Sequence, residues 1–265
     1  MKAQGKNIVV TGGGNGVGRE LVLQLLEKGA TVFAADINEE ALKETVKRAG
    51  NSKRLFTYVV DISNRESVFA FAKTVEEEHG SVDGIINNAG IIQPFIHLNE
   101  LEMDRIDRVM DINFYGTLYM VKAFLPYLLK RPEAHIVNVS SMGGFLPVPG
   151  QSIYGASKAA VKLLTEGLSS ELKGTNVNVS VVIPGGIATD IKKNSNIESK
   201  VTTDSSKANM VLTPAKAAEL IIKAMEQKKL RLYIGKDCNI MNFLYKANSN
   251  FAMKMINKVM NASEH

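Results

Sequence analysis

Residues 7–18, NIVVTGGGNGVG, decide the fold, because they combine a buried strand, a glycine-rich turn and the start of a helix. The strand is apolar without alternation, as in a parallel strand covered by helices on both faces. The glycines allow positive φ angles and leave room for a phosphate at the helix amino terminus, where free N–H groups attract anions. A tight turn without a ligand is the alternative interpretation. The T-G-x-x-x-G-x-G spacing is carried by Thr11, Gly12, Gly16 and Gly18.

The same alternation of strand and helix repeats along the chain. Apolar runs predict strands at 7–11, 31–35, 55–60, 84–87, 135–140, 178–183 and 231–234. Helical patterns lie between them at 16–28, 39–48, 65–79, 102–129, 154–173 and 214–227. Such units connect by right-handed crossovers, so we predict an α/β fold with a doubly wound (Rossmann-type) parallel sheet of about seven strands. No linker rich in Pro, Gly or Ser interrupts the pattern, so residues 1–265 are expected to form a single dinucleotide-binding and catalytic domain.

Composition narrows the class of protein. A hydrophobic content of 45% and a charged content of 22% are typical of soluble globular chains. The single cysteine, Cys238, excludes an intrachain disulfide, and no leader-like segment follows Met1, so a cytoplasmic location is predicted. The net charge of +5 lies in the carboxyl-terminal part, and the balanced remainder argues against nucleic-acid binding. The four histidines are scattered, so no metal site is predicted.

Three side chains could serve proton transfer. Tyr154 and Lys158 are four residues apart, so they share one face of a predicted helix. An ammonium placed there would favour the phenolate and lower the pKa of the tyrosine from its usual ~10. Ser141 follows the fifth strand and could direct its hydroxyl to the same point. Together they suit proton transfer to or from an alcohol oxygen. The alternative is a helix with a surface lysine and a half-buried tyrosine.

Strand ends elsewhere predict a dinucleotide. Asp36 ends the second strand, where a carboxylate accepts hydrogen bonds from the adenosine ribose and repels a 2′-phosphate. Neither its neighbours nor Asn15 in the turn supplies a cation, so NAD is predicted over NADP. Asp36 could instead cap the next helix, and Asp61 could either reach the adenine or cap a helix. Asn113 lies inside a helical run, where it either bends the helix and orders a water or is tolerated.

These motifs together resemble the short-chain dehydrogenase/reductase family over residues 6–235. The resemblance implies that Tyr154 is the general acid/base and that Lys158 lowers its pKa and binds the nicotinamide ribose. It also implies that Ser141 holds the substrate oxygen and that Asn113 anchors a relay water. The cofactor implied is NAD. The resemblance also implies that Ile187 and Thr189 meet the nicotinamide carboxamide. The implied cofactor-binding residues are Gly12, Asn15, Gly16, Val17, Gly18, Asp36, Ile37, Asp61, Ile62, Asn88, Ala89, Gly90, Tyr154, Lys158, Pro184, Gly185, Ile187 and Thr189.

The resemblance implies an oxidoreductase that interconverts a secondary alcohol and a ketone. An apolar pocket wall favours a substrate with a bulky apolar body, steroid-like or long acyl, although its side chains could equally be core. The alternatives are a 3-oxoacyl/3-hydroxyacyl reductase or dehydrogenase acting on a carrier- or CoA-bound chain, and a non-catalytic dinucleotide-binding protein acting through its basic carboxyl-terminal helix. Residues 190–212 are polar and are predicted to form a substrate lid. The predicted substrate-contacting residues are Ser141, Tyr154, Phe95, Met142, Gly143, Phe145 and Val148, with Ile91, Ile92 and Leu146 in the same wall.

Residues 236–265 extend beyond the short form of the family. Apolar residues recur there at spacings of three and four, with three lysines off that face, so a single amphipathic helix is predicted. We expect it to pack on its own domain or on a sister subunit; contact with the substrate mouth or with an anionic membrane is the less favoured alternative. The resemblance implies a homo-tetramer or dimer formed through the long helices at 102–129 and 154–173. The apolar residues are Ile240, Phe243, Leu244, Ala247, Phe251, Met255 and Val259, and the lysines are Lys246, Lys254 and Lys258.

Overall fold

The computed structural model describes residues 1–188, 195 and 212–261. Its centre is a seven-stranded sheet in the order β3-β2-β1-β4-β5-β6-β7, with every neighbouring pair parallel. The predicted doubly wound sheet is therefore confirmed. Thr189 and nearly all of the predicted lid lie outside the described residues. The strands are β1 (Asn7–Thr11), β2 (Thr31–Asp36), β3 (Leu55–Val59), β4 (Gly84–Asn87), β5 (Ala134–Val139), β6 (Val177–Pro184) and β7 (Arg231–Ile234).

The strand order reverses next to β1. The chain runs outward from β1 through β2 to β3, then returns to place β4 on the other side of β1. Consecutive connections therefore leave in opposite directions at the carboxyl ends of β1 and β4. In open α/β sheets this reversal opens the crevice in which ligands bind.

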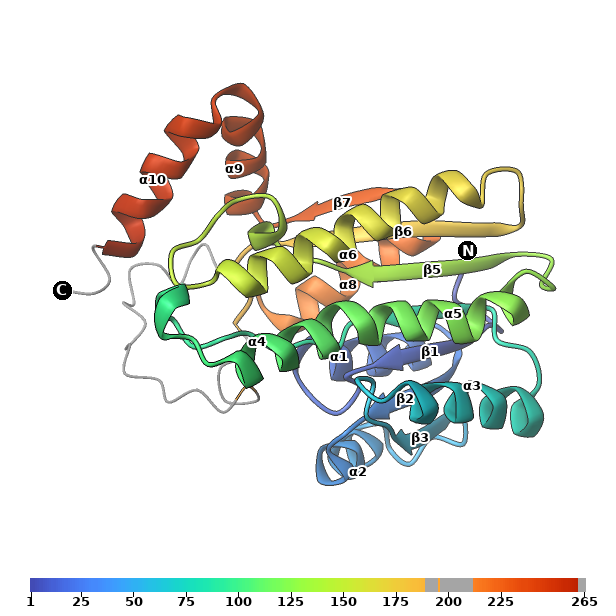
Figure 1. The fold of residues 1–265 in the computed structure, drawn as a ribbon. Helices are drawn as coiled ribbons and strands as arrows, with labels where there is room; N and C mark the ends of the chain where they lie inside the picture. The colour runs from blue at the N-terminus through green and yellow to red at the C-terminus, as the bar shows by residue number, and fades with distance from the viewer. Residues whose placement is uncertain (189–194, 196–211, 262–265) are drawn as a thin grey trace.

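Helices cover both faces of the sheet (Figure 1). One face carries α1 (Gly16–Glu27), α2 (Glu39–Arg48) and α8 (Pro214–Glu226), whose apolar side chains share a core with Val10 of β1. The other face carries α3 (Arg65–His79), α5 (Gly116–Leu128) and α6 (Ser152–Glu171), packed around Phe33 and Phe124. Burial on both sides explains why the strands read as continuous apolar runs. Two short 3₁₀ turns, η1 (Leu98–Glu100) and η3 (Met142–Gly144), complete this part of the chain.

The long helical run predicted at 102–129 is interrupted. It consists of α4 (Met103–Met110), a π-helical turn η2 (Asp111–Tyr115) and α5. Asn113 lies in the middle of the π-helical turn and is fully buried. Single π-helical turns are frequent at functional sites because they redirect a side chain. The disturbance anticipated at Asn113 is thus present.

The carboxyl-terminal extension forms two helices, so the prediction of a single helix is wrong. The helix α9 (Lys236–Ala247) ends at Asn248, whose extended backbone (φ −155°, ψ 97°) breaks the helical phase before α10 (Ser249–Asn261). The pair projects beyond the end of β7 (Figure 1). Its buried residues are Cys238, Met241 and Ala252, which confirms packing on its own domain. The predicted apolar face is mostly on the outside: Ile240, Phe243, Phe251 and Met255 are 52%, 71%, 54% and 39% exposed.

Candidate active site

Asn113 and Lys158 come together at Gly90, just after β4. A Cβ atom placed on Gly90 would lie 3.0 Å from both Asn113 Oδ1 and Lys158 Nζ, so the glycine leaves the space that these groups need. Asn113 Oδ1 accepts a hydrogen bond from the Ile91 N–H at 2.9 Å, and Asn113 Nδ2 donates to the Ile91 carbonyl at 2.9 Å. The Lys158 ammonium is 4% exposed and donates to the Val139 carbonyl at 3.0 Å. The fold therefore fixes the position of both side chains.

Ser141 and Tyr154 flank Gly143 in the same region. Ser141 caps η3, with its Oγ accepting from the Gly143 N–H at 3.1 Å. A Cβ on Gly143 would lie 3.4 Å from Tyr154 Cε1 and 3.7 Å from Ser141 Oγ. Ser141 is close enough to Tyr154 to lower the pKa of its phenol, against the larger effect of burial. The serine and the tyrosine, separate in the sequence, are thus neighbours beside the end of β5.

Burial controls the ionisation of Tyr154 and Lys158. Burial raises the pKa of Tyr154, and the interaction with Ser141 offsets this only in part. Burial lowers the pKa of Lys158 to about 8. In the protein alone, desolvation of the phenolate outweighs any lowering of the Tyr154 pKa, and the Lys158 ammonium donates to the Val139 carbonyl. The pKa-lowering part assigned to Lys158 stays a prediction.

Gln93 fixes the start of the helix that carries Tyr154, and sequence reasoning missed it. Its buried Oε1 accepts from the Ile153 N–H at 2.9 Å and from the Tyr154 N–H at 3.0 Å. Its Nε2 donates to the Gly150 carbonyl at 2.9 Å. Gln93 therefore acts as a cap supplied from another segment, and it satisfies amide groups that the first turn of α6 leaves unpaired. Ser157 adds a link, since its Oγ donates to the Tyr154 carbonyl and accepts from Asn113 Nδ2.

The glycine turn after β1 is built as the sequence predicts. Thr11 Oγ1 accepts from the Asn88 N–H at 3.0 Å and the Ala89 N–H at 3.1 Å, which joins the ends of β1 and β4. A Cβ on Gly18 would overlap the Gly12 carbonyl, so the helix can start this close to the turn only with glycine there. The remaining residues of the turn, Asn15, Gly16 and Val17, begin α1, where Asn15 makes no side-chain cap. The first N–H groups of α1 thus stay available to an anion.

Asp36 meets the turn directly, and a cation lies beside it. Asp36 Oδ2 accepts from the Gly14 N–H at 2.9 Å, and Oδ1 accepts from the Asn38 N–H at 3.0 Å. Asn38, rather than Asp36, caps α2. The Arg19 guanidinium donates to the Gly14 carbonyl, donates from Nε to Thr45 Oγ1 at 3.0 Å, and interacts electrostatically with Asp36. The expectation of no nearby cation is therefore wrong, because α1 directs Arg19 toward α2.

Three more of the predicted cofactor-binding residues follow β2 and β3: Ile37 follows β2, and Asp61 and Ile62 follow β3. Asp61 Oδ1 accepts from the Ser63 N–H at 2.9 Å and the Ser63 hydroxyl at 2.6 Å, while Asn64 caps α3. The capping role considered for Asp61 is therefore excluded. Ile62 is 9% exposed and lies against Gly116, whereas Ile37 is 64% exposed.

The segment after β6 is held by backbone pairing. The Gly185 N–H donates to the Ile234 carbonyl at 2.8 Å, and Ile187 forms an isolated parallel bridge with Leu212. Pro184 is the last residue of β6. The segment thus leaves the sheet at the same edge as the residues that follow β1, β4 and β5.

The predicted substrate wall is of mixed character. Leu146 is fully buried and belongs to a core cluster with Met241, so the core interpretation holds for this residue. Met142 and Phe145 are half-buried against the same cluster, and Val148 is half-buried. Phe95 is 46% exposed. These residues therefore do not form one continuous buried wall.

The residues present fit a dinucleotide. The fit rests on the glycine turn at the amino terminus of α1, the Asp36 carboxylate at the end of β2 and the small residues after β4. Within residues 1–188, 195 and 212–261, no three His, Cys, Asp or Glu side chains gather as a metal site would require. None of the helices in that part of the chain has the length and apolar character needed to cross a bilayer.

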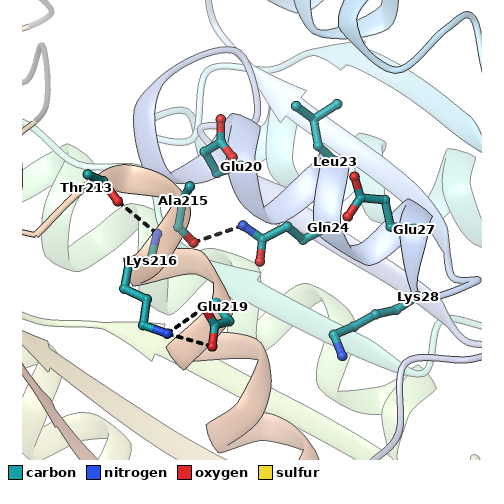
Figure 2. A pocket seen from close by; sticks show the side chains of 9 residues that line it. All are labelled: Glu20, Leu23, Gln24, Glu27, Lys28, Thr213, Ala215, Lys216 and Glu219. Atoms are coloured by element: carbon teal, nitrogen blue, oxygen red, sulfur yellow. Dashed lines mark hydrogen bonds and ion pairs between the residues drawn. The ribbon is translucent and has the colours of Figure 1, made fainter.

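A separate groove lies between α1 and α8 (Figure 2). Its volume is about 680 Å³, and none of its lining residues belongs to the predicted site. Its Lys216 is paired with Glu219 at 2.7 Å, and Gln24 Nε2 donates to the Ala215 carbonyl at 2.9 Å. The groove is therefore lined mainly by polar and charged side chains and lies apart from the predicted site residues at the strand ends.

Comparisons with solved structures place the fold among dinucleotide-bound proteins. A short-chain dehydrogenase/reductase from Burkholderia phymatum in complex with NAD matches with a TM-score of 0.80 and 29% identity over 88% of this chain and 90% of that one. A short-chain dehydrogenase from Burkholderia cenocepacia in complex with NADP matches with a TM-score of 0.82 and 28% identity over 97% and 99%. The chain thus shares its fold with proteins that bind either dinucleotide.

Sequence comparisons identify the family. SadH of Mycobacterium tuberculosis is 33% identical over 249 residues, which cover 91% of this chain and 90% of SadH. The 3-oxoacyl-(acyl-carrier-protein) reductase FabG of Thermotoga maritima is 36% identical over 190 residues, 71% of this chain and 77% of FabG. The family model for short chain dehydrogenase matches residues 6–200. The chain therefore belongs to the short-chain dehydrogenases, a family of oxidoreductases with a dinucleotide-binding fold.

Proposed function

We propose that this oxidoreductase interconverts a secondary alcohol and a ketone with NAD as its cofactor. The observation that carries the proposal is the convergence of four polar side chains on two glycines. Ser141 and Tyr154 flank Gly143, and Asn113 and Lys158 meet at Gly90. Proton transfer at an alcohol oxygen needs a donor, a partner that orients the oxygen and a route for the proton, and these side chains offer all three.

Each residue has a distinct part in this mechanism. The Ser141 hydroxyl holds the substrate oxygen, and Tyr154 takes the alcohol proton in oxidation or returns it in reduction. Lys158 would contact the nicotinamide ribose, and its positive charge would stabilise the phenolate that forms in oxidation. Asn113 and the Ile91 backbone hold the site from which a water passes the proton onward. The dinucleotide, when bound, supplies the hydride chemistry, and its positive ring when oxidised adds to the charge that lowers the pKa of Tyr154.

The NAD preference rests on Asp36. Its carboxylate lies at the ribose side of the glycine turn, where a 2′-phosphate would meet its negative charge. Arg19 is close, but its guanidinium is engaged by the Gly14 carbonyl and Thr45. Arg19 would have to leave these partners to bind a phosphate, and so we propose that it does not reverse the preference.

The substrate class proposed is an alcohol or ketone with a bulky apolar body. Half-buried Met142, Phe145 and Val148 follow Ser141 and support this class. A 3-oxoacyl or 3-hydroxyacyl chain on a carrier or CoA is the second candidate, favoured by the similarity to FabG. A panel of steroid, long-chain and acyl-thioester substrates, followed by NADH and NADPH absorbance, tests both. Turnover of no alcohol or ketone with either cofactor would contradict the proposal.

We further propose a cytoplasmic homo-oligomer formed through α5 and α6. Leu163 on α6 is 70% exposed, and Tyr115 and Leu129 at the two ends of α5 are 41% and 42% exposed. Contiguous exposed apolar patches mark protein–protein contacts, and we propose that these three side chains belong to one. Light scattering at several protein concentrations measures the assembly, and a monomer at all of them would refute it.

A further inference from the structure

We propose that Asp237, in the carboxyl-terminal extension, is a positioning residue for the nicotinamide half of the cofactor. The inference rests on the proposed function, because the family resemblance implies that the segment after β6 meets the nicotinamide carboxamide. Asp237 Oδ2 accepts a hydrogen bond from the Gly186 N–H at 2.8 Å. Asp237 therefore reaches from α9 to the backbone of that segment.

The segment and the extension are joined at several consecutive residues. The Gly185 N–H donates to the Ile234 carbonyl at 2.8 Å, and the Cys238 thiol donates to the Ile183 carbonyl at 3.2 Å. On the other side, the Leu212 N–H donates to the Gly186 carbonyl at 3.1 Å. Gly186 is thus held between Leu212 and Asp237.

The packing around the carboxylate is close enough to require glycine. A Cβ atom on Gly185 would overlap both carboxylate oxygens of Asp237, and a Cβ on Gly235 would overlap one of them. Gly235 also has a φ of +104°, a region that other residues avoid. The carboxylate therefore lies directly against the backbone of the segment after β6, where a change in its size or place shifts that backbone.

The carboxylate is also held in place electrostatically. Asp237 is in the first turn of α9, where the helix dipole favours negative charge. Its Oδ1 is buried and has no hydrogen-bond partner among the residues that the structure describes. A buried acceptor left unpaired costs stability, so its presence suggests that positioning the segment outweighs that cost.

The same extension reaches the substrate side of the site. Met241 of α9 and Ala252 of α10 pack with Leu146, a few residues after Ser141, and Phe145 contacts Tyr245 at a centroid distance of 6.0 Å. The extension thus supports the segments after both β5 and β6.

Binding of NADH and of ADP-ribose, which lacks the nicotinamide, tests the proposal. Asp237→Ala should weaken NADH binding roughly tenfold, the loss expected for one hydrogen bond to a charged group, and leave ADP-ribose binding unchanged. Asp237→Asn keeps an acceptor for the Gly186 N–H and should bind NADH nearly as the wild type does. Lys236→Ala, one residue away and exposed, is the matched control and should change neither affinity.

The outcomes separate this proposal from the proposed function. Equal loss of NADH and ADP-ribose affinity in Asp237→Ala, or no loss of either, would overturn the positioning role. Wild-type protein that binds neither molecule would instead refute the dinucleotide function itself. If Asp237→Ala fails to fold, Gly185→Ala displaces the same backbone by collision and should show the same selective loss for NADH. Unchanged NADH binding in a folded Gly185→Ala protein would likewise contradict the proposal.

Discussion

Asn113 Oδ1 and Lys158 Nζ both border the space beside Gly90, each 3.0 Å from the point where a Cβ on that residue would stand. Each polar group is anchored separately, Asn113 by Ile91 and Lys158 by the Val139 carbonyl. The closeness of Asn113 and Lys158 depends on the absence of a side chain at Gly90. It therefore offers a way to disturb the site without removing either polar group.

Replacement of Gly90 by alanine should displace Asn113 and Lys158 and lower kcat. A misplacement of about 1 Å in a catalytic constellation can reduce the rate ~10²-fold. The matched control is Gly167→Ala in α6, where nothing lies within 4 Å of an added Cβ. That change should leave kcat unaltered and stabilise the helix by up to ~1 kcal/mol. Steady-state kinetics and thermal unfolding of both variants measure these effects. Equal kcat values in Gly90→Ala and Gly167→Ala would refute the claim that activity requires Asn113 and Lys158 to meet at Gly90.

Ketone reduction should lose activity as the pH rises through about 8. Reduction needs a protonated Tyr154, whose pKa is raised by burial, and a charged Lys158, whose pKa is about 8 for the same reason. Lys158 therefore loses its charge first, and kcat/KM should fall with a midpoint near that value. Profiles of kcat/KM between about pH 6 and pH 10 measure this limb. A constant kcat/KM across that range would exclude a requirement for the ammonium.

Asp36→Ala should relax the preference for NAD. Removal of the carboxylate removes the repulsion of a 2′-phosphate, and the positive charge of Arg19 then attracts that phosphate while its guanidinium keeps its partners. The ratio of kcat/KM for NAD to that for NADP should fall by at least roughly tenfold, equivalent to about 1.4 kcal/mol. Adding Arg19→Gln to this variant should reduce the use of NADP again. An unaltered ratio in Asp36→Ala would show that selectivity is set elsewhere.

Acid should destabilise the fold through His135. Burial lowers the pKa of His135 to about 3 from 6.5, and its Nε2 is paired with Ser180 Oγ at 2.8 Å. Between these values the unfolded chain binds a proton that the native state does not, so the free energy of unfolding falls as the pH drops below 6.5. Above pH 6.5 His135 does not reduce the free energy of unfolding. Near pH 5 it lowers that free energy by on the order of 2 kcal/mol.

Urea unfolding of variants at neutral and acidic pH measures that contribution. His135→Gln should narrow the difference in unfolding free energy between about pH 7 and pH 5, because glutamine binds no proton there. The exposed His97, replaced in the same way, should leave the difference as in the wild type. If the pH-dependent difference in unfolding free energy narrows equally in the His135 and His97 variants, or narrows in neither, a specific role for the buried imidazole is contradicted.

The sequence predicted the parts of the fold that depend on local pattern. Helices at 39–48 and 65–79 match α2 and α3 exactly in their bounds, because Asn38 and Asn64 cap them from adjacent positions. The strands were legible because burial on both faces leaves continuous apolar runs, as in Ile8 to Val10. Ser141, Tyr154 and Lys158 were recognisable because the family motif specifies their spacing.

The remainder depends on contacts between distant segments. Gln93 caps α6 from sixty residues away, and Asp237 meets Gly186 from a helix outside the motif. Asp237, two residues after Gly235, was the one local sign of that contact, as a first-turn acid of a helix. Arg19 was missed because the direction of its side chain follows from the packing of α1 against α2. The break at Asn248 was missed because the apolar period continues through it.

The most direct test of the account replaces Tyr154 by phenylalanine. The variant removes the phenolic oxygen beside Ser141 and keeps the ring that packs against Gly143. Turnover measured by NADH absorbance should fall by about 10²–10⁴-fold, the usual contribution of a general acid/base, while NADH binding stays nearly intact. Tyr115→Phe, on an exposed tyrosine, should retain full turnover. Tyr154→Phe protein that turns over substrate at the wild-type rate, or that loses cofactor binding to the same extent as activity, would contradict the assignment of Tyr154 as the proton-transferring residue.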